Sequence, residues 1–111
     1  MKNQNLAFID IETTGLLLDK HEIIEIGCVL VSQGSPGAPK FKKLEEFEIK
    51  IKPEHIETAD PVALKINGYN ETDWKDSVTL KEAMETLSQK TDGTMMVGHN
   101  VSFDWAFLEK A

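Results

Sequence analysis

Three apolar segments precede the first long helical pattern, and this order most constrains how the 111-residue chain folds. Residues 6–11 (LAFIDI) form a short apolar run, residues 23–31 (IIEIGCVLV) are rich in β-branched side chains, and residues 47–52 (FEIKIK) alternate strictly between apolar and polar. Such runs predict two buried strands and one half-buried strand. Because no helical pattern separates them, they predict an antiparallel three-stranded meander.

The second half of the chain predicts mainly helices. Residues 60–68 begin with Asp-Pro and end with Gly, which is typical of a short helix. Residues 79–90 open with a Thr-x-x-Glu capping box and carry apolar residues at helical spacing. Residues 94–97 (TMMV) predict a fourth strand, and residues 102–111 predict a last helix that has no C-cap Gly.

Composition excludes several classes of protein. The formal net charge is −7, all 12 cationic side chains are Lys, and no run of apolar residues is long enough to cross a bilayer. An acidic chain without Arg lacks the bidentate forks that hold phosphate or guanine, which by itself argues against nucleic acid as a partner. One cysteine and no signal-peptide pattern predict a single cytoplasmic domain without contact to a membrane.

Two carboxylates lie inside the first apolar run. Asp10 and Glu12 are two residues apart, so in a strand both project from the same face. Like charges held together there are tolerated if one carboxyl is protonated or if a divalent cation binds between them. Carboxylate oxygens suit Mg²⁺ or Mn²⁺. The alternative is a strand edge with both carboxylates in water.

A small turn follows these carboxylates. Thr13, Thr14 and Gly15 offer hydroxyl and N–H donors, and Gly permits a ligand to approach the backbone closely. The alternative is a plain turn that ends the strand. In the next apolar run, Glu25 is expected to face water or to support this turn, and Cys28 is expected to be inert core.

At this point the chain resembles a known family. Residues 8–15 (FIDIETTG) resemble the first motif of the DEDD superfamily of 3′–5′ exonucleases, closest to the DnaQ-like proofreading subunits of bacterial DNA polymerase III. Residues 23–27 (IIEIG) are similar to the second strand of that family, and residues 98–104 (GHNVSFD) resemble its second motif. In the short helix at 60–68, Asn67 stands where the family has His.

The resemblance implies a ribonuclease H-like α/β fold, with a mixed sheet in which the fourth strand runs parallel to the first and helices flank the sheet. The family has a third motif beyond the second, carrying a fourth Asp and a His or Tyr that orients or deprotonates water. This chain has no match to that motif before Ala111. We therefore expect residues 1–111 to be the N-terminal portion of one exonuclease domain, incomplete at its C-terminus.

The resemblance also implies two-metal hydrolysis of phosphodiester bonds. Asp10 would bridge two divalent cations, Mg²⁺ or Mn²⁺, Glu12 would hold one of them, and Asp104 would hold the other. The alternative role of Asp104 is to stabilise a helix N-terminus. The alternative role of Phe103 is core packing, and the apolar run 16–18 either wedges against a base or covers the core. The substrate contacts implied by the resemblance are Thr13, Thr14, Gly15, Leu16, Asn67, His99, Asn100 and Phe103.

The predicted function is therefore metal-dependent 3′–5′ exonuclease activity at nucleic-acid ends, with DNA proofreading or repair favoured. One alternative is an oligoribonuclease-like or RNase T-like activity on RNA, which shares both motifs. A second alternative is a catalytically incomplete fragment that only binds metal or nucleic acid. The expected partners are a single-stranded 3′ end and a DNA polymerase subunit, with self-association through the unfinished sheet or the last helix.

Overall fold

The computed structural model describes residues 5–32, 42–98 and 101–110, and of residues 101–105 it describes the backbone only. In this part of the chain three strands come first, followed by a short 3₁₀ helix at Ile56–Thr58, two α-helices, a fourth strand and a third α-helix. The strands are β1 (Leu6–Thr13), β2 (Ile23–Ser32), β3 (Lys42–Lys50) and β4 (Met95–Gly98). The helices are α1 (Pro61–Asn67), α2 (Leu80–Lys90) and α3 (Val101–Lys110).

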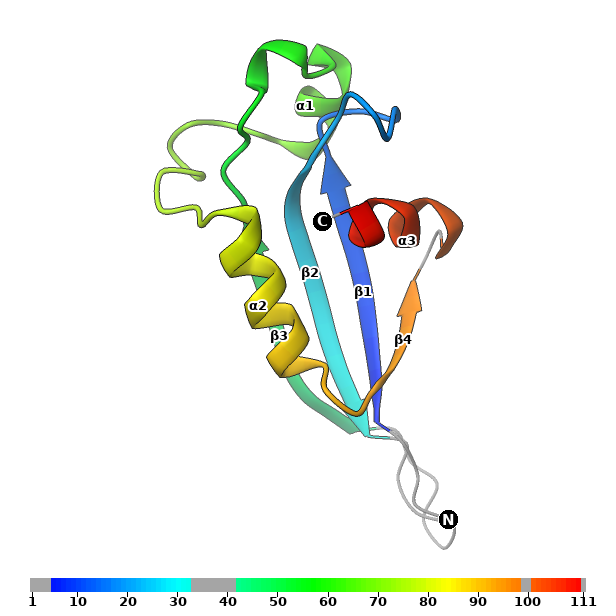
Figure 1. Cartoon of the computed structure of the whole chain (residues 1–111). Coiled ribbons are helices and arrows are strands. Elements are labelled where there is room, and N and C mark those ends of the chain that lie inside the picture. The colour runs from blue at the N-terminus through cyan, green and yellow to red at the C-terminus, as the bar shows by residue number, and fades with distance from the viewer. Residues whose placement is uncertain (1–4, 33–41, 99–100, 111) are drawn as a thin grey trace, which may run out of the picture.

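The four strands form one sheet in the order β3-β2-β1-β4. The pairs β1–β2 and β2–β3 are antiparallel, and β4 pairs in parallel with β1. The predicted meander and the predicted parallel fourth strand are both confirmed. Figure 1 shows α2 and α3 on the same side of this sheet, while α1 lies near the carboxyl end of β1.

The core lies between the sheet and these two helices. Every second residue of β1 is buried there, namely Ala7, Ile9 and Ile11. They belong to one cluster with Leu87 of α2 and Phe107 of α3. The intervening residues of β1 therefore project from the opposite face, because strand side chains alternate with period two.

The boundaries of β3 differ from the prediction. The strand begins at Lys42, five residues before the alternating run at 47–52, and it ends at Lys50. Its early start follows from pairing, because the ladder with β2 extends to the pair Ser32 and Lys42. Ile51 lies just outside the strand and forms a parallel bridge with Val78.

The predicted helix caps are confirmed. Asp60 Oδ1 accepts the Val62 N–H at 3.0 Å, and Gly68 ends α1 at a left-handed φ of 71°. Thr79 Oγ1 accepts the Glu82 N–H at 3.1 Å at the start of α2. Among the helices of the described residues, none is long and apolar enough to cross a membrane.

Candidate active site

Two candidate carboxylates lie on the uncovered face of β1, near its carboxyl end. In the β1–β2 ladder, Asp10 is opposite Gly27, and Glu12 is opposite Glu25. Asp10 is exposed and Glu12 is half-buried. The sequence-based expectation that both project from one face is confirmed by the burial pattern of the strand.

A hollow of about 760 Å³ opens beside Asp10 on this face. Phe8, Val29 and Val97 form its apolar part. Gly27 also lines it, and because Gly27 has no side chain, the space directly across the ladder from Asp10 stays open. The hollow therefore combines three acidic residues, Asp10, Glu46 and Glu48, with an apolar surface, an arrangement that suits a ligand with both charged and flat apolar parts.

The third acidic residue, Asp104, lies in the first half of α3. Strand β4 ends at Gly98, opposite Ile9 of β1, so α3 follows β4 at the end of the sheet where Asp10 lies. The topology that the prediction required is thus present. The side chains of Asp104 and Phe103, and the residues His99 and Asn100, lie outside the described part of the chain, so their predicted roles stay predictions.

The described residues include two members of the predicted metal site. No group of three His, Cys, Asp or Glu side chains that could hold a metal ion occurs within 5–32, 42–98 and 106–110. Asp10 and Glu12 are the members found there, and their oxygen donors match the preference of hard divalent cations.

The turn after the carboxylates is held by internal hydrogen bonds. Thr13 Oγ1 donates to the Gly15 carbonyl at 2.6 Å, and Thr14 Oγ1 accepts the Glu22 N–H at 3.0 Å. Both threonines are buried. Their hydroxyls therefore fix the turn, and direct contact of Thr13, Thr14 and Gly15 with substrate stays a prediction.

The space beside Gly15 is taken by a histidine ring. A Cβ atom built on Gly15 would lie 2.3 Å from Cε1 and Nδ1 of His21, which is too close for any side chain. We expected Gly15 to leave room for a ligand to approach the backbone, and His21 was not among the predicted site residues. No sequence signal indicates this contact. In the structure, the positive-φ glycines of the described chain are Gly68 and Gly93, so Gly15 is required for its small size and not for its backbone conformation.

Helix α1 is tied to the same turn. Asn67 Nδ2 donates to the Thr13 carbonyl at 2.7 Å, and the Asp60 N–H donates to the Thr14 carbonyl at 2.7 Å. Asn67 thus lies beside the first motif, and its contact with substrate, which the resemblance implied, stays a prediction. Leu16 is 79% exposed, so it does not cover the core.

An ion pair stands next to Glu12. Lys50 Nζ lies 2.5 Å from Oε1 of Glu25, the residue opposite Glu12, and 4.3 Å from the ring centroid of Trp74. The hydrogen bond to Glu25 raises the pKa of Lys50 above 10.5. The expectation that Glu25 faces water or supports the Thr13 turn is wrong, because its carboxylate binds Lys50.

Cys28 confirms its expected role as core. The side chain is buried and faces away from Asp10, among the apolar residues that pack under the helices. Burial raises the pKa of its thiol above 9.0, and the Glu45 carboxylate adds to that rise. The thiol therefore remains protonated and unreactive near neutral pH.

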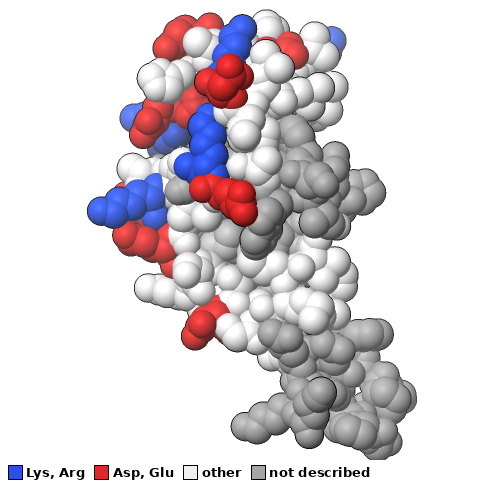
Figure 2. Space-filling model, turned by 45° about the vertical axis from the view of Figure 1, so that its right-hand side comes forward, with Lys and Arg blue, Asp and Glu red and all other residues white. Residues whose placement is uncertain are grey.

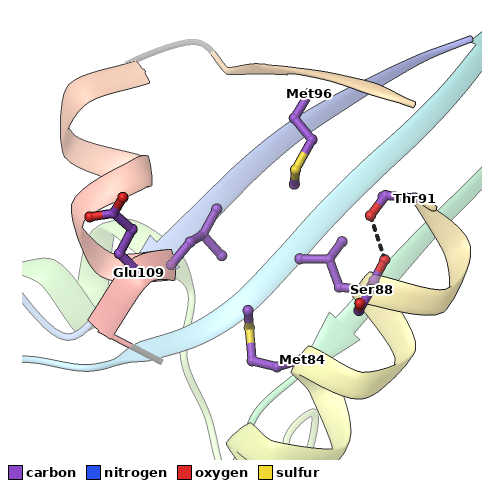
Figure 3. Close-up of a pocket in the computed structure, with 7 residues that line it drawn as sticks. Met84, Ser88, Thr91, Met96 and Glu109 are labelled. Carbon is purple, nitrogen blue, oxygen red and sulfur yellow. Dashed lines mark hydrogen bonds between the residues drawn. The ribbon is translucent and has the colours of Figure 1, made fainter. Parts of the chain in front are cut away.

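A separate pocket of about 230 Å³ lies on the covered side of the sheet, between α2, α3 and β4. Figure 3 shows Met84 and Met96 pointing toward this space, while the carboxylate of Glu109 points away from it. None of the predicted site residues lines the pocket.

The charged surface has no single basic patch on the face drawn in Figure 2. On the described part of that face, Lys side chains are interspersed with Asp and Glu. This distribution agrees with the composition, in which acidic residues outnumber lysines.

Comparison with known proteins places this chain in a family. The sequence profile of the exonuclease family (RNase T) matches residues 7–111. The DNA polymerase III PolC-type of Mycoplasmopsis pulmonis is 30% identical over 108 residues, covering 97% of this chain and 7% of that protein. The 3′-5′ exonuclease DinG of Staphylococcus saprophyticus is 30% identical over 105 residues, covering 95% of this chain and 11% of that protein.

Solved structures show the same fold. Exonuclease I of E. coli, in complex with a dA16 oligonucleotide, superposes with a TM-score of 0.77 at 17% identity, covering 95% of this chain and 23% of that one. The likeness shows the ribonuclease H-like fold that the resemblance implied. The chain thus spans less than a quarter of each of these relatives. With the profile matched over nearly its whole length, the chain belongs to the exonuclease family.

Proposed function

We propose that this chain acts in 3′–5′ exonuclease chemistry, the metal-dependent hydrolysis of phosphodiester bonds at the 3′ ends of single-stranded nucleic acid, with DNA as the preferred substrate. The observation that carries the proposal is the pair of carboxylates, Asp10 and Glu12, on the open face at the carboxyl end of β1. Family membership supports it independently.

Exonucleases of this family generally depend on divalent metal ions. The donor set fits such ions, because carboxylate oxygens are the ligands that Mg²⁺ and Mn²⁺ prefer. We propose that Asp10 and Glu12, together with Asp104 as the resemblance implies, hold two of them. When bound, the ions would stabilise negative charge on the attacking and leaving oxygens.

The residues around the carboxylates are proposed to bind the terminal nucleotide. The turn Thr13–Gly15 and the exposed side chain of Leu16 stand at the end of β1, and Phe103 follows by the resemblance. Apolar and stacking contacts accept any base, which fits an enzyme that is indifferent to sequence. With no Arg and interspersed Lys, we expect weak binding to long duplexes.

The relatives favour DNA. Exonuclease I has been solved with dA16 and dT13 oligonucleotides, and other relatives are DNA polymerase III proteins. We propose by analogy that a DNA polymerase is a partner and that the location is cytoplasmic. Self-association and the assignment of residues 1–111 to the N-terminal portion of one domain stay predictions. Translating the source DNA past Ala111 tests the latter through the presence of His-x₄-Asp or Tyr-x₃-Asp.

The test is a nuclease assay on end-labelled single strands of DNA and RNA, with Mn²⁺ and with EDTA. We expect Mn²⁺-dependent trimming from the 3′ end that Asp10→Ala abolishes. Asp92→Ala is the matched control, because Asp92 is an exposed carboxylate in the turn before β4, distant from the site. Faster trimming of RNA would favour the RNase T-like alternative, and Mn²⁺ binding without trimming would favour the binding module.

A further inference from the structure

The loop between β1 and β2 presents three leucines to solvent. Leu16, Leu17 and Leu18 are 79%, 53% and 40% exposed, in a segment that begins three residues after β1 ends. Exposure of several adjacent apolar side chains to water is unfavourable, and such a group typically marks a site where a ligand or partner binds. The backbone of this loop is held in one conformation by hydrogen bonds to a residue of the loop itself, His21.

One residue binds both backbone groups of Leu17. The Leu17 N–H donates to Nδ1 of His21 at 3.0 Å, and the Leu17 carbonyl accepts the His21 N–H at 2.8 Å. An Nδ1 atom that accepts a hydrogen bond belongs to a neutral ring whose hydrogen is on Nε2. His21 therefore closes the loop with its side chain and its backbone at once.

The His21 ring also fills the inside of the loop. It is 6% exposed and lies against Gly15, where any Cβ atom would be 2.3 Å from the ring. A side chain at position 15 would thus expel the ring, and with it the acceptor for Leu17. The glycine and the histidine are two halves of one contact.

Two further contacts hold the ends of the loop. Lys110 Nζ of α3 donates to the Leu18 carbonyl and, at 3.3 Å, to the His21 carbonyl. At the base of the loop, the Thr14 N–H donates to the Glu22 carbonyl at 2.9 Å. The loop is therefore anchored to the sheet and to α3, and His21 fixes the part between them.

We propose that His21 is a positioning residue for substrate, which holds Leu16–Leu18 in the conformation that receives the 3′-terminal nucleotide. This inference rests on the proposed exonuclease function. When only a fraction of the protein molecules hold the binding conformation, the apparent affinity for the ligand falls in proportion to that fraction. A loop that is held in this conformation in every molecule avoids that loss. Removing the Nδ1 acceptor should therefore weaken nucleotide binding without changing metal binding at Asp10.

The test compares two substitutions in the full 111-residue chain. His21→Asn places an amide oxygen near the position of Nδ1, whereas His21→Leu fills the space without an acceptor. If the loop is ordered in about one molecule in ten without the acceptor, His21→Leu raises the Kd for a 5′-labelled thymidine oligonucleotide about tenfold. We expect His21→Asn to restore affinity to within about twofold of the wild type and Mn²⁺ affinity to be the same in all three proteins.

A second measurement does not depend on any variant. An N–H···N hydrogen bond transmits a scalar coupling between its two nitrogen atoms, so ¹⁵N NMR of the wild-type chain should show a coupling between the Leu17 amide and Nδ1 of His21. The Leu17 amide should also exchange slowly with solvent. Absence of the coupling together with fast exchange would overturn the proposal even if His21→Leu fails to fold.

The remaining outcomes separate this proposal from the proposed function. If the wild-type chain binds the oligonucleotide and His21→Leu binds it equally well, only the positioning role is overturned. Equal weakening by His21→Asn and His21→Leu also overturns it, because the acceptor then has no part. If the wild-type chain neither binds nor trims the oligonucleotide, both proposals fail.

Discussion

The two faces of β1 have opposite properties, although the residues alternate along one strand. Ala7, Ile9 and Ile11 are buried under α2 and α3, while Asp10 and Glu12 occupy the face that no described helix covers. The covered face supplies apolar burial, and the open face keeps two like charges close together. Successive residues of β1 therefore serve different purposes, one stabilising the fold and the next carrying the proposed chemistry. Substitutions at adjacent positions should accordingly change either the free energy of unfolding or metal binding, but not both.

The largest expected effect is on the covered face. Ile11→Ala should lower the free energy of unfolding by about 2–5 kcal/mol, because it removes three buried methyl or methylene groups from the core. Urea denaturation followed by circular dichroism measures it. Ile11→Val, which removes one group, should cost about 0.5–1.5 kcal/mol. A loss for Ile11→Ala below that of the Val variant would contradict the separation of the two faces.

The next effect concerns the adjacent residue on the open face. Asp10→Asn should weaken Mn²⁺ binding at least about tenfold, since even partners of metal ligands contribute that much. The free energy of unfolding should be unchanged or slightly higher, because the substitution removes one of two neighbouring negative charges. Isothermal titration with Mn²⁺, paired with urea denaturation, measures both, and Asp92→Asn is the control. Loss of stability comparable to Ile11→Ala would break the comparison.

One corner of the open face is expected to contribute to stability. Trp74 is buried, donates its Nε1–H to the Ile24 carbonyl at 2.9 Å and lies beneath Lys50. Trp74→Phe keeps an aromatic ring but removes one of the two donors to that carbonyl, which also accepts the Ile51 N–H at 2.8 Å, so it should cost about 0.5–1.5 kcal/mol. Thermal unfolding gives the value. A neutral result would mean that the open face is purely functional.

A smaller effect should have opposite signs for stability and activity. A Cβ atom on Gly27 would meet only the Asp10 carbonyl oxygen at 3.7 Å, an ordinary contact. Gly27→Ala should therefore stabilise the strand by about 0.5–1 kcal/mol. The added methyl group would stand in the hollow beside Asp10 and should slow trimming of a labelled oligonucleotide. Unchanged trimming would show that this part of the hollow is not used.

The smallest effect is a pH dependence. The pKa of Lys50 is raised above 10.5 chiefly by its hydrogen bond to Glu25, so the folded state holds the proton more tightly than the unfolded state. The resulting stability is fully present below 10.5 and is lost as the pH rises through the folded-state pKa. Urea denaturation across that range should show a steeper decline for the wild type than for Glu25→Gln. Parallel declines would refute the link.

Much of the fold follows from local patterns. The apolar run in residues 6–11 and the caps at Asp60 and Thr79 predict their elements because the physical cause is local. The early start of β3 was missed, since residues 42–46 become a strand only by pairing with β2. The end of β4 also shifts by one residue for this reason, to Gly98 opposite Ile9.

The candidate site likewise contains some features that local sequence patterns predict and others that they do not. Asp10 and Glu12 could be assigned to one face from their spacing, whereas Asp104 and Asn67 came only from a family resemblance. The contact between Gly15 and His21 could not be predicted, because five residues of loop without a repeating pattern separate them. The ion pair of Glu25 with Lys50 escaped for a related reason, since it depends on the register of β2 against β3.

The shared space of Gly15 and His21 has an evolutionary consequence. Because the ring occupies the volume of any larger residue at position 15, neither position is free to vary alone. Homologous chains that have a side chain at the first position should lack a ring at the second, and the two should change together. In a lineage that has lost the histidine, position 15 can accept a residue larger than glycine. Paired changes at positions 15 and 21 would therefore mark when the structure of this loop changed in evolution.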